Sequence, residues 1–191
     1  YENLVPALRL MRMEHGPAVG GRRITVSTAG YLPGIQRLAA EDLNIGLAIS
    51  LNATTDEIRQ RIMPINRKWK IADLIKAARD FYDQRGRRVT FEYVLLDGIT
   101  DADEDALRLA SLTRGFPSKI NLIPYNELGE DSEFRRPPAA RVARFRTLLE
   151  EHSPMAVTLR ESRGRDIDAA CGQLFHQSPE PAAAVVSEHE F

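Results

Sequence analysis

The stretch NIGLAISLNATTDEIRQRIM, residues 44–63, contains the two kinds of element from which the fold is predicted. Its first half is almost continuously apolar, which is typical of a strand that is covered on both faces. Its second half, TTDEIRQRIM, places hydroxyl residues and acids together where a helix should begin. The stretch therefore predicts a buried strand followed directly by a helix.

The same unit of strand and helix recurs along the chain. Apolar residues at helical spacing, or acids at a helix start, predict helices over residues 1–15, 32–41, 70–86, 101–115 and 139–152. Runs rich in β-branched and other apolar residues predict strands over residues 22–30, 87–98, 118–126 and 155–162. Gly86 suits the end of the third of these helices. Strands that alternate with helices imply parallel pairing through helical crossovers.

The predicted fold class is α/β. Five strands preceded by a helix indicate the back portion of a TIM-like (β/α) barrel whose N-terminal strands are missing from the chain. A doubly wound open sheet is the alternative, although the sequence has neither a GxGxxG nor a P-loop motif. We expect residues 1–177 to form this part of a barrel. Residues 178–191 are rich in proline, alanine and acids, and we expect them to form a disordered tail.

The composition indicates the class of protein and its cellular compartment but does not identify a binding partner. The chain has 191 residues, a formal net charge of −1 and 43% hydrophobic residues, as in a soluble globular protein. One cysteine cannot form an internal disulfide, which favours a reducing, cytoplasmic location. No apolar run approaches the roughly 20 residues of a membrane span. Because the sequence opens on a helical pattern without an initiator Met, we expect it to be the C-terminal part of a longer protein.

Polar side chains gather where the predicted strands end, which in barrels is the functional rim. They are Ser27 and Thr28, then Ser50 and Asn52 on either side of the apolar Leu51, then Asp97, then Tyr125 and Asn126. Such hydroxyl and amide groups suit a polar, weakly charged ligand such as a ribose, an amino acid or an adenine. Turns and helix caps are the ordinary use of these residues, and Asn52 could help to start the next helix.

Glu92 and the arginines leave alternatives open. Glu92 lies inside an otherwise apolar strand, so it either binds a ligand from within the barrel or pairs with an arginine. Residues 135–165 contain eight arginines and three acids. Arg141 and Arg144 lie on a predicted helix whose exposed side could simply be solvated. Three others flank a glycine and suit RNA phosphate: Arg160, Arg163 and Arg165.

Cys171, in the stretch RGRDIDAACGQL (residues 163–174), is the only cysteine. A lone cysteine is most often a small buried apolar residue. Six motifs occur here in order, VSTAG, AISLNA, MPINRKW, FEYVLLDG, INLIPYN and RGRDIDAACGQL. Together they closely resemble the C-terminal part of the RlmN-type radical SAM RNA methyltransferases. That family methylates C2 of adenine in 23S rRNA and tRNA, and the resemblance runs from residue 1 to about residue 177.

The resemblance implies roles for particular residues. It implies that S-adenosylmethionine is contacted by Ser27, by Ser50, Leu51 and Asn52, and by Asn126. It implies that Cys171 becomes S-methylated and carries the methyl group to the RNA, which suits a thiolate because it is a strong nucleophile. One departure is that Asn52 replaces the usual histidine of the family, and asparagine cannot take up a proton near neutral pH.

The resemblance also implies components that this chain does not carry. Radical SAM enzymes hold a [4Fe–4S] cluster through a CxxxCxxC loop, and three thiolates are needed where this chain has one. We therefore assign no metal ligand here and expect the cluster ligands upstream of Tyr1. A reducing partner such as flavodoxin, a monomeric state and RNA as the substrate are further expectations. The alternative function is a cluster-free RNA-binding module that is derived from the same fold.

Overall fold

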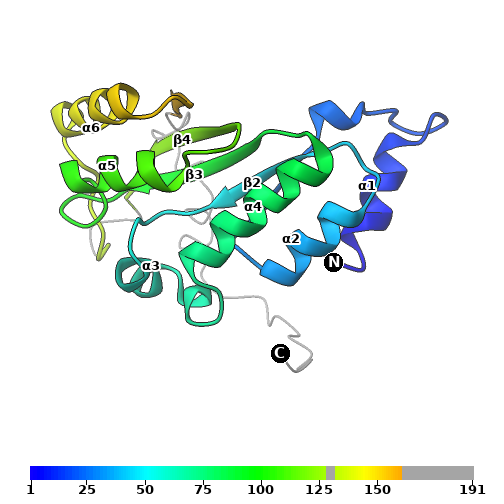
Figure 1. Ribbon diagram of the computed structural model, residues 1–191, viewed down its shortest axis with the longest axis horizontal. Coiled ribbons are helices and arrows are strands. Elements are labelled where there is room, and N and C mark those ends of the chain that lie inside the picture. The colour runs from blue at the N-terminus through cyan, green and yellow to red at the C-terminus, as the bar shows by residue number, and fades with distance from the viewer. Residues whose placement is uncertain (128–131, 161–191) are drawn as a thin grey trace, which may run out of the picture.

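Helices and strands alternate along the chain in the computed structural model, which describes residues 1–127 and 132–160 (Figure 1). The helices are α1 (Leu4–Arg12), α2 (Leu32–Ala40), α3 (Asp56–Ile62), α4 (Ile71–Arg85), α5 (Asp103–Leu112) and α6 (Ala139–His152). Two short 3-10 helices are η1 (Gly21–Arg23) and η2 (Pro64–Arg67). The strands are β1 (Thr25–Thr28), β2 (Gly46–Ser50), β3 (Val89–Leu95), β4 (Ser118–Pro124) and β5 (Ala156–Leu159). The predicted alternation is confirmed, and the first helix ends three residues earlier than expected.

The five strands form one parallel sheet in the order β1-β2-β3-β4-β5. A doubly wound sheet reverses its strand order at a switch point, whereas a barrel adds each strand beside the one before it. The order along the described strands is sequential throughout. The partial TIM-like barrel is therefore the architecture, and the doubly wound alternative is wrong for this part of the chain.

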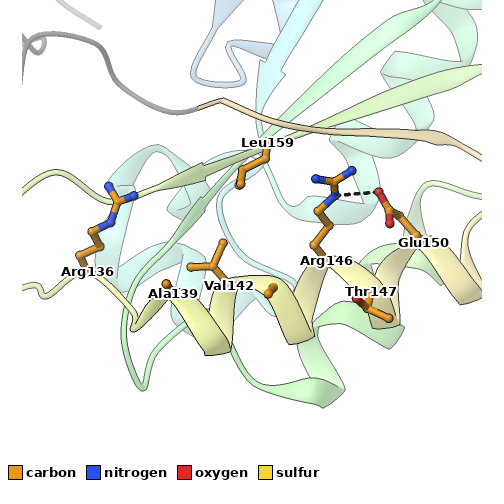
Figure 2. A pocket seen from close by; sticks show the side chains of 8 residues that line it. Arg136, Ala139, Val142, Arg146, Thr147, Glu150 and Leu159 are labelled. Atoms are coloured by element: carbon orange, nitrogen blue, oxygen red, sulfur yellow. Dashed lines mark hydrogen bonds and ion pairs between the residues drawn. The ribbon is translucent and has the colours of Figure 1, made fainter.

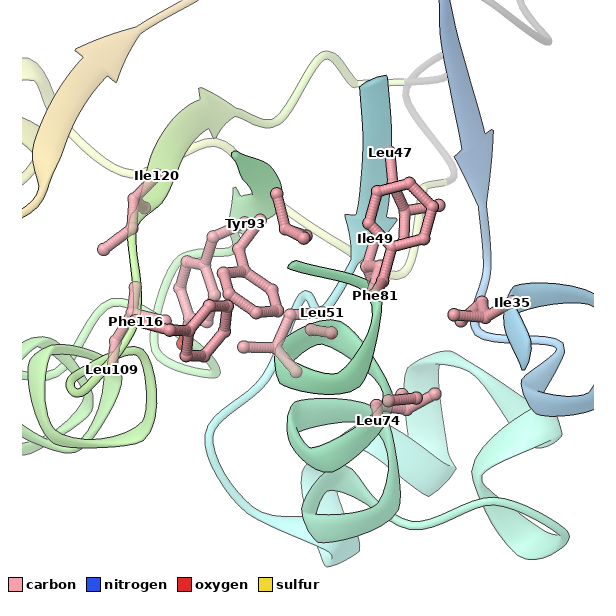
Figure 3. Close-up of a cluster of buried hydrophobic side chains, with 14 of the residues drawn as sticks. Ile35, Leu47, Ile49, Leu51, Leu74, Phe81, Tyr93, Leu109, Phe116 and Ile120 are labelled. Atoms are coloured by element: carbon pink, nitrogen blue, oxygen red, sulfur yellow. The ribbon is translucent and has the colours of Figure 1, made fainter. Parts of the chain in front are cut away.

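One face of the sheet carries the hydrophobic core. Burial alternates along β3 and β4, as expected of strands with one face packed against helices. The buried residues of the strands face the helices and pack against side chains from α4, α5 and α6, as Figure 3 shows in part. Tyr93 stacks on Phe145 of α6 with ring centroids 5.7 Å apart, and Phe91 meets Phe116 edge to face at 6.2 Å. This packing fixes which face of the sheet remains available for a ligand.

The helices after β2 begin and end where local chemistry requires. The Thr55 hydroxyl accepts a hydrogen bond from Ile58 N at 3.4 Å and so caps α3. Helix α4 buries Ile71, Leu74 and Phe81 at helical spacing. It ends at Gly86, whose φ of 62° is the left-handed conformation that glycine adopts without strain. The predicted role of Gly86 is confirmed.

Among the helices that the structure describes, none has both the length and the apolar composition to cross a bilayer. Residues 178–191, which we expected to form a tail, lie outside the described ranges, so that expectation stays a prediction.

Candidate functional site

A row of polar side chains crosses the sheet on the face opposite the core. The strand register aligns Ser50 with Glu92, Glu92 with Asn121, and Asn121 with Thr158. Residues aligned in this way project from the same face of a parallel sheet. Their sequence neighbours on β3 and β4 are buried in the core. The sheet therefore presents an apolar face to the helices and a polar face on its other side.

Glu92 is the centre of this row. Its Oε2 accepts hydrogen bonds from Ser27 Oγ at 3.2 Å and from Ser50 Oγ at 3.4 Å. Its Oε1 lies 3.9 Å from Arg160 Nη1, and 18% of the Glu92 side chain is exposed. The two interpretations of Glu92 left open by the sequence are thus compatible, since the carboxylate faces the open side of the sheet and also pairs with an arginine.

Beyond Glu92, the row continues over β4 and β5. The Thr158 hydroxyl forms a short hydrogen bond with Asn121 Oδ1. Arg160 N donates to Leu122 O at 2.8 Å, which continues the strand pairing one residue past β5. Sequence reasoning assigned Arg160 to RNA phosphate and missed Asn121 and Thr158. The short alternation of polar and apolar residues from Lys119 to Leu122 was the signal that could have identified Asn121.

Asn52 has a structural role that the sequence did not indicate. Its φ is 59°, a conformation that asparagine adopts more readily than most residues. Its Oδ1 accepts a hydrogen bond from Val94 N at 3.2 Å, and its Nδ2 donates to Met63 Sδ at 3.3 Å. The suggestion that Asn52 starts helix α3 was wrong, because Thr55 provides that cap. Asn52 instead ties the end of β2 to β3.

A buried arginine holds the ends of β1 and β2 together. The Arg59 side chain is fully buried, and its guanidinium donates to Leu51 O at 2.9 Å, Ala29 O at 2.7 Å and Ser50 O at 3.1 Å. It also donates to Asn66 Oδ1 at 3.0 Å. Burial lowers the pKa of Arg59 and nearby Asp56 opposes that shift, but an arginine stays protonated in proteins. Arg59 therefore fixes the backbone from which Ser27 and Ser50 project.

Leu51 and Asn126 differ from the other predicted cofactor contacts. The Leu51 side chain is completely buried, and its N–H donates to Glu92 O at 2.9 Å. Leu51 thus supports the site through its backbone and faces the core with its side chain. Asn126 Oδ1 accepts from Arg136 Nη1 at 3.4 Å, and no described hydrogen bond joins Asn126 to Glu92. The structure brings Ser27, Ser50 and Glu92 together but does not join Asn126 to them.

Several arginines of the arginine-rich region form ion pairs. Arg144 forms a short, bidentate pair with Asp103, and Arg141 Nη1 lies 3.1 Å from the same carboxylate. The hydrogen bond from Arg144 lowers the pKa of Asp103 below its usual range. Arg146 pairs with Glu150 at 2.8 Å. The local positive charge counted from the sequence is therefore partly neutralised in the fold.

Cys171, Arg163 and Arg165 lie outside the described residues. Within residues 1–127 and 132–160, no three His, Cys, Asp or Glu side chains form a group that could hold a metal ion. The described part of the chain accordingly has no site that fits a [4Fe–4S] cluster.

A cavity of about 320 Å³ lies between α6 and β5 (Figure 2). It is lined by residues such as Arg136, Val142, Arg146 and Leu159. Leu159 aligns with Leu122 of the buried core, so the cavity is on the helix-covered face of the sheet. A ligand in this cavity therefore could not contact the hydroxyl and carboxylate groups on the opposite face of the sheet.

Comparison with known proteins agrees with this architecture. Residues 1–110 match the model of the radical SAM superfamily. A crystal structure of a radical SAM methyltransferase from Sphaerobacter thermophilus superposes with a TM-score of 0.86 at 46% identity, over 91% of this chain and 50% of that one. A domain of pyruvate-formate lyase-activating enzyme from Bacteroides vulgatus shares the fold at 18% identity, with a TM-score of 0.52.

Curated relatives add a more specific similarity. The dual-specificity RNA methyltransferases RlmN of Anaeromyxobacter dehalogenans and Geobacter sulfurreducens are 52% and 51% identical to this chain, each over 91% of it. The chain covers 46% and 47% of those proteins, so it spans about half the length of the curated relatives that it matches. The sequential parallel sheet, the polar row on its open face and the family match over more than half of the residues lead to one conclusion: this chain belongs to the radical SAM superfamily.

Proposed function

We propose that the protein of which this chain forms a part methylates C2 of adenosine in RNA, both 23S rRNA and tRNA, with S-adenosylmethionine as the methyl donor. The observation that carries the proposal is the cluster of Ser27, Ser50 and Glu92 on the open face of a radical SAM sheet. The RNA methyltransferase names of the similar proteins supply the reaction class and favour an enzyme over a cluster-free RNA-binding module.

The chemistry of this cluster fits the proposed donor. S-adenosylmethionine offers ribose hydroxyls and an ammonium group as hydrogen-bond donors, and a carboxylate as an acceptor. Glu92 can accept from the donors, while the hydroxyls of Ser27 and Ser50 can donate or accept. When bound, S-adenosylmethionine supplies the methyl group and the radical chemistry that an unactivated aromatic carbon requires. The chain's own contribution at these positions is to bind and orient it.

Cys171 is proposed as the methyl carrier. S-adenosylmethionine would supply the methyl group, and the Cys171 thiolate would accept it as the donor's sulfonium becomes a neutral thioether. The [4Fe–4S] cluster does not fit the described residues, and we place its ligands, and the contact for a reducing partner such as flavodoxin, in the rest of the protein. A monomeric, cytoplasmic enzyme is part of the same proposal.

The test uses the full-length enzyme with its cluster, RNA and a donor that carries a deuterated methyl group. We expect mass spectrometry to detect the label on the peptide that contains Cys171 during turnover, and then on C2 of adenosine. Cys171→Ala should abolish RNA methylation while leaving donor binding intact. Unmodified RNA with the wild-type enzyme, or continued methylation by Cys171→Ala, would contradict the proposal.

The cofactor site can be tested separately by binding. We expect Ser27→Ala combined with Ser50→Ala to weaken the binding of S-adenosylmethionine, because two hydroxyl groups beside Glu92 are lost. Ser111→Ala, at an exposed serine of α5, is the matched control. Equal affinity for S-adenosylmethionine in the double variant and the control would show that Ser27 and Ser50 do not bind the donor.

A further inference from the structure

Two aromatic residues and two basic residues lie at the end of the sheet that holds the carboxyl ends of the strands. We call Tyr31, Arg67, Lys68 and Trp69 the aromatic corner. Tyr31 follows β1 by three residues, and the other three lie between α3 and the start of α4. Helix α4 returns antiparallel to the strands, so both segments are at the carboxyl ends of β1 and β2. Figure 1 shows α3 and the following turn at this end of the sheet.

The rings have a defined geometry. Tyr31 and Trp69 pack edge to face with centroids 5.1 Å apart, and Lys68 Nζ lies 5.1 Å from the Trp69 centroid. Tyr31 is nevertheless 47% exposed. Gly34 makes room for it, because a Cβ at that position would lie 2.7 Å from Tyr31 Cδ1. Tyr31 is thus packed against Trp69 and Gly34 while nearly half of its surface stays open to solvent.

The corner is fixed to the candidate cofactor site through buried hydrogen bonds. Asn66, in η2 and directly before Arg67, is fully buried and accepts from Arg59 Nη1 at 3.0 Å. Arg59 in turn donates to Ala29 O and Ser50 O, which border the strand ends that carry Ser27 and Ser50. A molecule that touches the corner therefore contacts a rigid surface next to the site.

The charge of the corner is also unneutralised. Residues 59–72 contain five basic residues and no acid. Arg67 and Lys68 are exposed, and within the described part of the chain neither forms an ion pair. By contrast, Arg141 and Arg144 share Asp103. Exposed cations beside an exposed aromatic ring are the combination that binds unpaired nucleic acid, through phosphate attraction and base stacking.

We propose that the aromatic corner binds an unpaired stretch of the RNA substrate, with Tyr31 stacking on a base and with Arg67 and Lys68 contacting phosphates. The inference rests on the proposed function for the class of substrate. It differs from the sequence-based assignment, which placed RNA on Arg160, Arg163 and Arg165. The corner adjoins the cofactor site, so RNA held there presents an extruded base to that site.

The experiment measures RNA binding by the full-length enzyme in fluorescence anisotropy at several salt concentrations. The ligand is a hairpin with adenosine in its loop, and a blunt duplex of equal length serves for comparison. Arg67→Ala with Lys68→Ala should reduce the magnitude of the salt slope for the hairpin by about 1.4, or about 0.7 for each lost phosphate contact. Arg22→Ala with Arg23→Ala removes the same charge from exposed residues at the opposite end of the sheet and should leave the slope unchanged.

A second pair of variants tests stacking. Tyr31→Ala should weaken hairpin binding about tenfold, whereas Tyr31→Phe, which keeps the ring, should bind like the wild type. Donor affinity should be unchanged in all these variants, which also shows that they are folded.

The outcomes separate this inference from the proposed function. If the wild-type enzyme methylates no RNA, the proposed function fails. If the wild type methylates RNA while the Arg67 and Lys68 variant keeps the wild-type slope and KM for RNA, only the aromatic corner is overturned. Equal losses in both double variants would also overturn it, because binding would then depend on overall charge. Equal affinity of Tyr31→Ala and Tyr31→Phe would refute stacking.

Discussion

Replacing Arg59 with methionine should destabilise the fold strongly, because one buried side chain satisfies four acceptors. Three are the backbone carbonyls of Ala29, Ser50 and Leu51, and the fourth is Asn66 Oδ1. The distances from the guanidinium nitrogens are 2.7–3.1 Å. Methionine fills most of the volume but donates no hydrogen bond, so all four acceptors lose this donor.

The magnitude follows from these four contacts. A buried acceptor that loses its partner costs about 1–3 kcal/mol. Carbonyl oxygens have a second lone pair and the surrounding loops can adjust, so the low end of the range applies, about 1 kcal/mol for each acceptor. The expected loss is about 4 kcal/mol, a large fraction of the roughly 5–15 kcal/mol by which domains are stable.

Urea unfolding of the full-length protein, followed by circular dichroism, measures this loss. The matched control is Arg61→Met on the same helix, where the arginine is 53% exposed and pairs with Glu133 at the surface. That variant should change the free energy of unfolding by at most about 0.5 kcal/mol. If Arg59→Met lies within 1 kcal/mol of Arg61→Met (a margin of about twice that surface value), the inferred role of the buried guanidinium is refuted.

Three further changes test other parts of the structure. Gly86→Ala should lower the free energy of unfolding in urea by about 1 kcal/mol, because the φ of residue 86 is 62°. Gly20→Ala should lower it less, because the φ of residue 20 is −58° and the space around it is open. Equal losses in the two variants would refute the conformational argument. Glu92→Gln should weaken S-adenosylmethionine binding about tenfold in calorimetry, because hydrogen bonds to a charged acceptor exceed those to a neutral one by about 1–1.5 kcal/mol; unchanged affinity would place Glu92 outside the site. In NMR titration the Asp103 carboxylate should have a pKa below its usual value, and Arg144→Ala should raise that pKa. The ion pair should stabilise the fold above the pKa of Asp103 in the unfolded chain, and this stabilisation should be lost as the pH falls through the pKa in the folded protein. An unchanged pKa in the variant would contradict this.

Local sequence patterns predicted most of the fold because the interactions that they reflect are local. The continuous apolar run of residues 45–49 becomes a strand with every residue buried up to Ile49. Gly86 ends α4 in the left-handed conformation that few other residues adopt easily. Alternation of elements was enough to predict parallel pairing, since each crossover contains a helix.

Arg59 and Asn52 show what local patterns could not predict. A charged residue in a predicted helix is ordinarily assigned to the solvent side, yet Arg59 is buried by loops 30 and 8 residues away, whose carbonyls it binds. Asn52 resembled a helix cap, but the hydroxyl of Thr55 makes that contact and Asn52 bonds to Val94, 42 residues away. In both cases the deciding partner is distant in sequence, so no short window contains it.

The polar row depends on strand register, which explains why only part of it could be predicted. Alternation within β4 indicates that Asn121 lies opposite Ile120 and Leu122, but only the pairing aligns Asn121 with Glu92. A slip of one residue would bury Asn121 and turn Ile120 and Leu122, both fully buried here, onto the polar face. The core therefore selects the register, and the register in turn places the polar groups in one line. The buried hydrophobic residues of β4 thus determine where Asn121 lies relative to Glu92 and Thr158.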